Sequence, residues 1–214
     1  MTNQQEQAHR TQRASAHDWD ARYRDADLPW DSGTPADELV AYFASLAKDN
    51  LPGAVLEVGC GTGTNAVWLA QQGCKVTATE IAPTALAMAQ ERAQKAGVEV
   101  ELGLIDICVT APVAVASQDF AFDRGVYHVI PVASRPAFVA SLAAGLKTGG
   151  HWLSVAGSKD EHRDNPDEGP PQLSAVELLQ DVEPLFALVK LERSSFVLPN
   201  GKVHLAWVAL YAKR

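Results

Sequence analysis

The chain of 214 residues is 47% hydrophobic and carries a formal net charge of -8, so it can bury one sizeable core. It has no apolar run of the roughly 20 residues that span a bilayer, and its polar N-terminal segment has no signal-peptide core. The acidic balance argues against nucleic acid, and three scattered cysteines fit neither a disulfide framework nor a zinc site. We therefore expect a cytoplasmic protein that acts on a small molecule, with no metal, nucleic-acid or membrane partner. The sequence carries no sign of the oligomeric state.

The first part of the chain divides into a polar tail and an aromatic segment. Residues 1–16 have too little apolar surface to offset the entropy of ordering, which predicts a disordered tail. Three large aromatic residues follow, Trp19, Tyr23 and Trp30. Residues 35–48 then repeat apolar side chains at helical spacing. We expect residues 17–214 to form a single domain whose first part, residues 17–50, is an aromatic cap.

From residue 54 onward, strand and helix patterns alternate. Strands are predicted at residues 54–58, 75–80, 98–105, 120–123, 151–156, 186–192 and 203–212, and helices at 64–72, 83–96, 136–146 and from Ser174 onward. Crossover helices between strands imply a parallel sheet that is covered on both faces. The turn at residues 199–202 makes the last strand antiparallel. The sequence therefore predicts an α/β, Rossmann-like fold with a mostly parallel, seven-stranded sheet.

Two connections in the second half of the chain carry turn signals. Thr148-Gly149-Gly150 predicts a turn before the strand at residues 151–156. Residues 158–172 contain no large apolar side chain and follow that strand, at the edge where open α/β sheets bind ligands. This second segment is either a mobile loop beside the site or a solvated connection without function.

The segment from Val55 to Gly63 carries the main functional motif. Gly59, Gly61 and Gly63 follow a strand and precede a helix, so the backbone can turn sharply and approach a ligand without hindrance from Cβ atoms. Glu80 ends the next strand, where a carboxylate can accept hydrogen bonds from ribose hydroxyls. Together these features predict a nucleoside pocket.

The spacing of the glycines separates two kinds of nucleoside ligand. A dinucleotide fingerprint reads G-x-G-x-x-G, and here the third glycine of that pattern is replaced by Thr64. The spacing G-x-G-x-G therefore argues against an NAD-dependent oxidoreductase. That class and a non-catalytic nucleoside-binding module remain the alternatives to a transferase.

The order of strand, glycine triplet, helix and acid resembles motif I of class I S-adenosylmethionine-dependent methyltransferases. The resemblance implies that S-adenosylmethionine is the cofactor and that Glu57 orients the turn or the methionine ammonium. It also implies that Asp106 accepts from the adenine amino group, with a solvated turn aspartate as the alternative. The implied contact set is completed by neighbours of these positions: Gly59, Cys60, Gly61, Gly63, Asn65, Ile81 and Ile107.

Further segments resemble one superfamily within this class of methyltransferases. Residues 19–23 and 29–35, together with Phe122-Asp123-Arg124-Gly125, look like the thiopurine methyltransferase superfamily, especially its thiol and halide branch and relatives linked to tellurite resistance. In that family the aromatic residues that match Trp19, Tyr23 and Trp30 close over the cofactor, and the residue that matches Arg124 lies beside it. Two structural alternatives stay open: the aromatics staple a helix to the core, and Arg124 pairs with Asp123.

The expected reaction is in-line displacement, in which a nucleophile attacks the sulfonium methyl and S-adenosylhomocysteine leaves. The acceptor is expected to be a thiol, sulfide or other soft nucleophile, because thiols ionise near neutral pH without strong base assistance. The alternative is an N- or O-methyltransferase of a small heterocyclic metabolite. Tyr127 and His128, after the fourth predicted strand, are the candidate catalytic bases, and a packing role is open for each.

Overall fold

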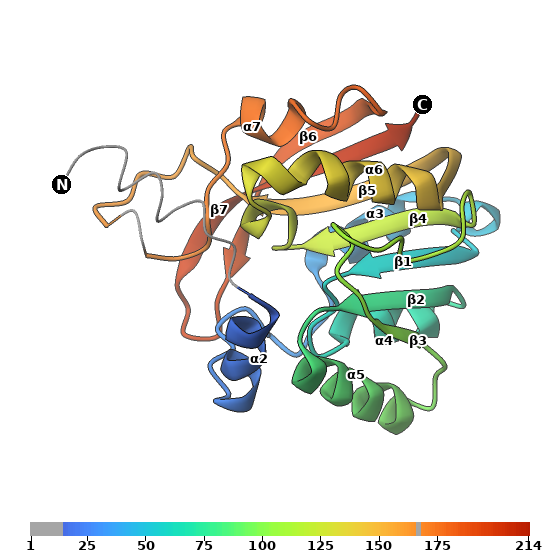
Figure 1. The fold of residues 1–214 in the computed structure, drawn as a ribbon, viewed down its shortest axis with the longest axis horizontal. Coiled ribbons are helices and arrows are strands. Elements are labelled where there is room, and N and C mark those ends of the chain that lie inside the picture. Colours follow the sequence, from blue (N-terminus) through green and yellow to red (C-terminus); the bar gives the residue numbers. More distant parts are fainter. Residues whose placement is uncertain (1–14, 166–167) are drawn as a thin grey trace.

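A seven-stranded sheet forms the centre of the protein in the computed structural model, which describes residues 15–165 and 168–214. The strands follow the order β3-β2-β1-β4-β5-β7-β6 (Figure 1). Their bounds are β1 Ala54–Val58, β2 Lys75–Glu80, β3 Glu101–Leu104, β4 Gln118–Arg124, β5 Leu146–Gly157, β6 Phe186–Val197 and β7 Val203–Lys213. Strands β1 to β5 pair in parallel, whereas β7 runs antiparallel to both β5 and β6. The predicted mostly parallel sheet with an antiparallel last strand is confirmed.

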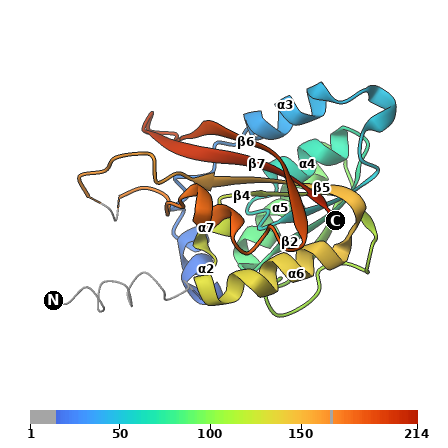
Figure 2. The ribbon, with the colours of Figure 1, turned by 90° about the horizontal axis from the view of Figure 1, so that it is seen from above.

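Helices cover both faces of this sheet, as the view from above shows (Figure 2). Their bounds are α2 Ala16–Arg24, α3 Asp37–Ser45, α4 Thr64–Gln71, α5 Pro83–Ala96, α6 Arg135–Gly145 and α7 Ala175–Leu179, with single 3₁₀ turns at Lys48–Asn50, Tyr127–Val129 and Val132–Ser134. Helices α3 and α4 lie on one face, and α6 and α7 lie on the other. The predicted α/β, Rossmann-like architecture is therefore the observed one. Among the described residues, no helix has the length and apolar character needed to cross a membrane.

Alternation along the strands divides the core into two layers. On β4, Phe120 and Phe122 pack into one layer while Ala121, between them, belongs to the other. The first layer is completed mainly by side chains of α3, α4 and α5, including Leu39, Phe43, Leu69 and Ala89. The second is completed by α6, α7 and the C-terminal strands, including Phe138, Leu142, Leu178, Trp152 and Tyr211. The sheet is thus buried on both faces, as its near-continuous apolar strands require.

Two details of the fold differ from the sequence prediction, and the strand order is a finding of the structure. Strand β7 lies between β5 and β6, because the chain passes outward along β6 and returns inside it. Residues 148–150 belong to β5, where Gly149 has a φ of +74° and the pairing with β4 shifts register. A turn-like sequence here marks a strand irregularity. Helix α2 begins at Ala16, within the segment assigned to the tail, and residues 1–14 lie outside the described residues.

Helix α2 of the cap begins at a capping motif in its sequence. Ser15 is the N-cap residue: its side chain accepts from the backbone N–H of Asp18, and the Asp18 carboxylate accepts from the backbone N–H of Ser15. This reciprocal pair is a capping box, which satisfies two N–H groups that a helix start leaves free. Helix α2 then packs on α5 through a small cluster that contains Tyr23, Ala82 and Ala85.

Replacement of a residue at the centre of the sheet tests the packing of these layers. Leu56 on β1 is fully buried, so Leu56→Ala should lower the free energy of unfolding by about 2–5 kcal/mol through lost burial and a residual cavity. Val109→Ala is the control, because Val109 is 81% exposed, and it should change stability by less than about 0.5 kcal/mol. Urea unfolding measures both. Equal effects of the two changes would contradict this packing.

Candidate active site

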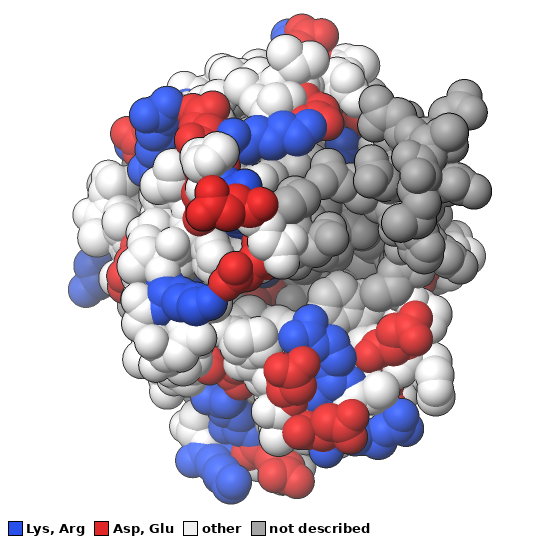
Figure 3. All heavy atoms as spheres, turned by 90° about the vertical axis from the view of Figure 1, so that its left-hand side faces the viewer, with Lys and Arg blue, Asp and Glu red and all other residues white. Residues whose placement is uncertain are grey.

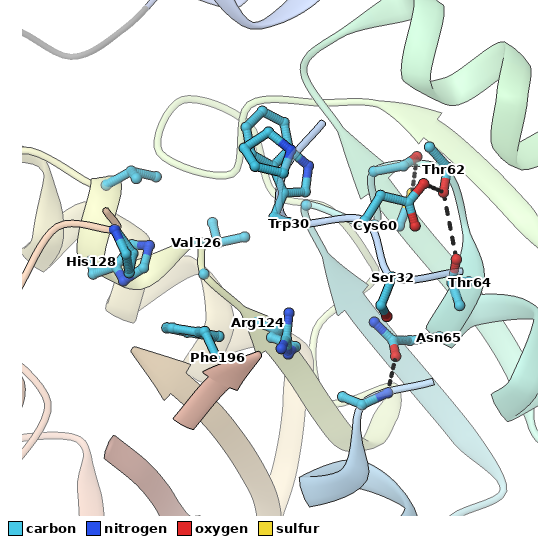
Figure 4. Close-up of a pocket in the computed structure, with 18 of the residues that line it drawn as sticks. Trp30, Ser32, Cys60, Thr62, Thr64, Asn65, Arg124, Val126, His128 and Phe196 are labelled. Carbon is cyan, nitrogen blue, oxygen red and sulfur yellow. Dashed lines mark hydrogen bonds between the residues drawn. The ribbon is translucent and has the colours of Figure 1, made fainter. Parts of the chain in front are cut away.

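A cavity of about 850 Å³ opens where β1, β2 and β4 end. Its walls come from the aromatic cap, the glycine turn, the segments that follow β2, β3 and β4, residues 168–171 and the β6–β7 hairpin. This is the edge at which open α/β sheets bind ligands. Figure 4 shows that Thr62 and Thr64 lie on one side of the cavity, while Arg124, Phe196 and His128 lie across from them. The cavity lies within the range of small-molecule sites, toward its upper end.

The glycine turn presents bare backbone to this cavity. Gly61 has a φ of +54°, a left-handed conformation that favours glycine, and its backbone N–H donates to Glu80 Oε2 at 3.0 Å. A Cβ atom on Gly61 would lie 3.0 Å from the Tyr23 hydroxyl, so any side chain there would press on the cap. Gly63 has a φ of +80° and lies against Ala89 of α5, where a Cβ atom would come within 2.8 Å of the alanine Cβ. Gly61 therefore lines the cavity, and Gly63 serves the packing behind it.

Glu80 fixes the turn from the inside. Its Oε1 accepts the backbone N–H groups of Ile81 at 2.6 Å and Ala82 at 3.1 Å, and its Oε2 accepts that of Gly61. Burial raises the pKa of Glu80, and these three N–H donors oppose that shift. The carboxyl group lines the cavity and keeps acceptor capacity on each oxygen. A ribose diol is a ligand of matching chemistry.

Glu57 lies behind the cavity wall rather than in it. Its Oε1 accepts from Asn65 Nδ2 at 3.2 Å, and Asn65 does line the cavity. Asn65 Oδ1 accepts the backbone N–H of Ala36 at 2.8 Å (Figure 4). One amide therefore joins the cap to the buried acid. Burial raises the pKa of Glu57 to about 8. Glu57 therefore holds Asn65 in the first turn of α4, and its two expected roles, toward the turn and toward the methionine ammonium, stay predictions.

The aromatic cap forms a second wall. Trp30 meets Trp19 and Tyr23 edge to face, with ring centroids 5.6 and 5.9 Å apart. The guanidinium of Arg22 lies 4.2 Å from the centroid of the Trp30 ring. All four side chains line the cavity, and Tyr23 also packs against α5. The cap therefore lines the cavity and also packs on α5, and its closure over the cofactor stays a prediction.

A buried carboxylate that the sequence analysis did not single out attaches the cap to α5. Asp20 is 7% exposed, and its Oδ1 accepts the backbone N–H of Thr84 at 2.7 Å, in the first turn of α5. The carboxylate thus satisfies an otherwise free N–H and lies at the positive end of the helix dipole. The sequence feature that could have marked Asp20 as a site residue is its position between the aromatic residues Trp19 and Tyr23.

Other expected contact residues also reach the cavity. Gly59, Cys60, Ile81, Asp106 and Ile107 all line it, and burial raises the pKa of the Cys60 thiol well above its usual range. Asp106 Oδ1 accepts the backbone N–H of Cys108 at 3.0 Å. The segment after β3 therefore lies beside Glu80, which is where a nucleoside base would lie if Glu80 held its ribose.

The guanidinium of Arg124 lies in the cavity wall without a carboxylate at ion-pair distance among the described residues. Within residues 15–165 and 168–214 it forms no ion pair, and its buried Nε has no hydrogen-bond acceptor. Its guanidinium lies 4.7 Å from the ring centroid of Phe196. Burial lowers the pKa of Arg124, opposed by the charges of Glu38 and Asp37. The sequence does not mark Phe196 as a site residue, because nothing in the pattern of β6 brings that strand to the site.

The alternative role of Arg124 as partner of Asp123 is wrong. Asp123 points to the other face of β4, is fully buried, and accepts from the Trp152 indole N–H at 2.9 Å and the backbone N–H of Tyr127 at 3.0 Å. Neighbouring residues of a strand point to opposite faces, which separates the two side chains. Asp123 holds the segment that follows β4, and Arg124 remains available to a ligand.

The two candidate bases occupy different places. Tyr127 is fully buried in the core between Phe138 and Trp152, does not line the cavity, and has its pKa raised by burial. Its placement matches the packing alternative. His128 lines the cavity, but its Nδ1 accepts the backbone N–H of Gly157 at 2.8 Å. Burial lowers the pKa of His128 to about 3, so the ring is neutral at pH 7 and a weak base.

Charged side chains of both signs are mixed on one face of the protein. On the face drawn in Figure 3, lysine and arginine side chains lie among aspartates and glutamates rather than in a separate basic area. The described ranges contain no cluster of three or more histidine, cysteine or carboxylate side chains that could hold a metal ion.

The buried Glu57 gives the free protein a specific pH dependence. Because its pKa is raised from 4.5 to about 8, the folded state binds more protons than the unfolded state between these values. Glu57 therefore contributes a fall in the free energy of unfolding of up to about 1.4 kcal/mol per pH unit, and Glu57→Gln should remove this contribution. His128, whose pKa is lowered from 6.5 to about 3, contributes with the opposite sign below pH 6.5, so the net fall is expected above that pH. Urea unfolding at pH 5.5 to 8 measures it, with the exposed Glu99→Gln as control. A slope unchanged by Glu57→Gln would refute the assignment.

The chain matches a known protein family and several known proteins. The family model described as thiopurine S-methyltransferase matches residues 14–209. A 2-heptyl-1-hydroxyquinolin-4(1H)-one methyltransferase of Mycobacteroides abscessus is 27% identical over 162 residues, which cover 72% of this chain and 66% of the relative. A ubiquinone biosynthesis O-methyltransferase of Methylobacterium nodulans is 34% identical over 102 residues, 48% of this chain and 40% of the relative. The matched regions thus span less than two thirds of these relatives.

Solved structures share the fold. A protein studied for the conversion of a disulfide bond into a thioacetal group during echinomycin biosynthesis superposes with a TM-score of 0.80, 22% identity and 92% coverage of each chain. The 1,6-didemethyltoxoflavin-N1-methyltransferase of Burkholderia thailandensis gives a TM-score of 0.74 at 20% identity and covers 100% of this chain and 91% of its own. With the family model matched over nearly the whole domain, the chain belongs to the thiopurine S-methyltransferase family of class I S-adenosylmethionine-dependent methyltransferases.

Proposed function

We propose that the protein transfers a methyl group from S-adenosylmethionine to a small soft nucleophile, most simply a thiol or sulfide. The observation that carries the proposal is the unpaired Arg124 guanidinium, which shares one cavity with the glycine turn and Glu80. The turn and the acid suit a nucleoside, and the cation suits an acceptor that reacts as an anion. The thioacetal-forming neighbour, whose described reaction is at sulfur, is compatible with this choice.

One half of the cavity, lined by Gly61, Glu80, Asp106 and Ile107, fits S-adenosylmethionine, and we call it the cofactor half. Gly61 leaves room that a Cβ atom would fill, and Glu80 offers acceptor capacity to ribose hydroxyls. Asp106 and Ile107 line the adjacent wall, where an adenine would meet one acceptor and an apolar side chain. When bound, S-adenosylmethionine supplies a methyl group on a sulfonium, which a nucleophile removes by in-line displacement. The role of the protein is to align that nucleophile and to exclude water.

The other half of the cavity, lined by Arg124, His128 and Phe196, is called the acceptor half. It favours a nucleophile that needs no strong base. His128 is a weak base because its pKa is about 3, and Tyr127 is enclosed in the core. A free thiol ionises with a pKa of about 8.5, and a nearby guanidinium favours the thiolate further. Arg124 is placed to provide that charge, since among the described residues no carboxylate forms an ion pair with it, and Glu38 and Asp37 act on it only as nearby charges. An acceptor in this half would therefore arrive as, or become, an anion beside Arg124.

A second candidate is methylation of a nitrogen or oxygen on a small heterocycle. Two similar proteins carry names of this kind, the hydroxyquinolinone methyltransferase and the didemethyltoxoflavin N1-methyltransferase. The apolar walls formed by Val126, Phe196 and Pro170 suit a flat ring as well as a thiol. An acidic heterocycle would meet the same requirement for an anion beside Arg124.

Replacement of Arg124 tests the proposed division of the cavity. Arg124→Met should raise the KM of an anionic acceptor by about ten- to a hundredfold, because a hydrogen bond to a charged group is lost. The affinity for S-adenosylhomocysteine should stay within about threefold. Arg193→Met, at a 70% exposed side chain, is the matched control and should alter neither constant. Loss of S-adenosylhomocysteine affinity with an unchanged acceptor KM would instead assign Arg124 to the cofactor.

A panel of acceptors tests the choice of nucleophile. Thiols, sulfide, selenide, halide, heterocyclic amines and N-hydroxy heterocycles are each incubated with S-adenosylmethionine, and S-adenosylhomocysteine is measured. We expect thiols to be the best substrates and their turnover to survive Tyr127→Phe and His128→Asn within about fivefold, since neither side chain is a required base. The Asn amide oxygen can replace Nδ1 as acceptor of the Gly157 N–H. Turnover confined to amines and abolished by His128→Asn would contradict the proposal.

A further inference from the structure

The Thr62 hydroxyl links three segments that are distant in sequence. Thr62 lies at the tip of the glycine turn, between Gly61 and Gly63, and is 5% exposed. Its Oγ1 donates to Asp31 Oδ2 of the cap at 2.8 Å and accepts from Arg92 Nη2 of α5 at 3.0 Å. One hydroxyl thus uses its single proton toward the cap and a lone pair toward α5.

Arg92 and Asp31 fix both sides of this hydroxyl. Arg92 Nε also donates to the Thr62 carbonyl oxygen at 2.9 Å, so its guanidinium holds the backbone and the side chain of the same residue. Asp31 Oδ1 accepts the backbone N–H of Gly33 at 3.0 Å, which shapes the chain that follows Trp30. Arg92 and Asp31 lie 3.7 Å apart and are 35% and 19% exposed, so water screens their attraction only in part.

The position of this network relates it to the cofactor rather than to general packing. Glu80 holds the turn from inside the cavity through Gly61, while Arg92 holds it from α5 through the next residue, Thr62. Thr62 lines the cavity (Figure 4). Asp31 adds the cap and lines the same cavity. A shift of the cap therefore removes the acceptor that orients Thr62, and a shift of the turn removes the donor that Asp31 binds.

We infer that Asp31, Thr62 and Arg92 form a latch that couples the position of the aromatic cap to the shape of the glycine turn. Asp31 and Arg92 are positioning residues: they act through Thr62 on the backbone that meets the cofactor. The latch belongs to the cofactor half of the cavity, and its test is independent of which acceptor is methylated. Its expected signature is energetic coupling between the cap and the turn.

A double-mutant cycle in calorimetric affinity for S-adenosylhomocysteine tests the latch. Thr62→Val removes the hydroxyl and keeps the branched shape, and Asp31→Ala removes the carboxylate that accepts from it. Each should weaken binding by about tenfold, and the double variant should weaken it by clearly less than about a hundredfold, because both variants lose the hydrogen bond between Thr62 and Asp31. Thr62→Ser, which retains the hydroxyl, should restore affinity to within about twofold.

Controls separate the latch from a general structural role. Asp27→Asn breaks the exposed Arg22–Asp27 ion pair within the cap and should leave the affinity unchanged. Thermal unfolding of the ligand-free variants checks folding, and Arg92→Met replaces Thr62→Val if the latter does not fold. Multiplicative losses in the double variant, equal binding by Thr62→Ser and Thr62→Val, or lower thermal stability with unchanged affinity would each overturn the inference.

Discussion

The buried Glu80 carboxylate is the constraint on which the cofactor half of the site depends. It ends β2, and its two oxygens accept the backbone N–H groups of Gly61, Ile81 and Ala82. Because these donors come from both β1 and β2 connections, one side chain sets the separation between the glycine turn and the start of α5. The cap rests on the same turn, through Tyr23 beside Gly61 and Asp31 on Thr62. Without these hydrogen bonds, Glu80 would not tie the glycine turn to the start of α5.

The sequence was most informative where local chemistry dictates the backbone. Alternating strand and helix patterns predicted the sheet and its parallel character, and the glycine spacing with Glu80 predicted the turn that lines the cavity. The insertion of β7 between β5 and β6 could not be predicted, because strand order depends on long-range packing and not on the turn between two strands. For the same reason Phe196 escaped notice, since only that order brings β6 to Arg124.

Side-chain direction explains the remaining differences. Asp123 and Arg124 are neighbours in sequence, and the strand sends one into the core and the other into the cavity. Tyr127 and His128 are likewise adjacent, yet the first packs against Trp152 and the second reaches the cavity wall. Glu57 lies one hydrogen bond behind the wall, through Asn65. A motif places such residues near a site, whereas the packing of the strands and of the turns that follow them decides which ones face the ligand.

The central claim is that this cavity is built for a nucleoside sulfonium and not for a dinucleotide. Titration calorimetry of the wild-type protein with S-adenosylhomocysteine and, separately, with NAD tests it most directly. S-Adenosylhomocysteine should bind with one site per chain, because the glycine turn, Glu80 and Asp106 converge on a single cavity, and NAD should give no binding heat. Binding of NAD without binding of S-adenosylhomocysteine would contradict the account.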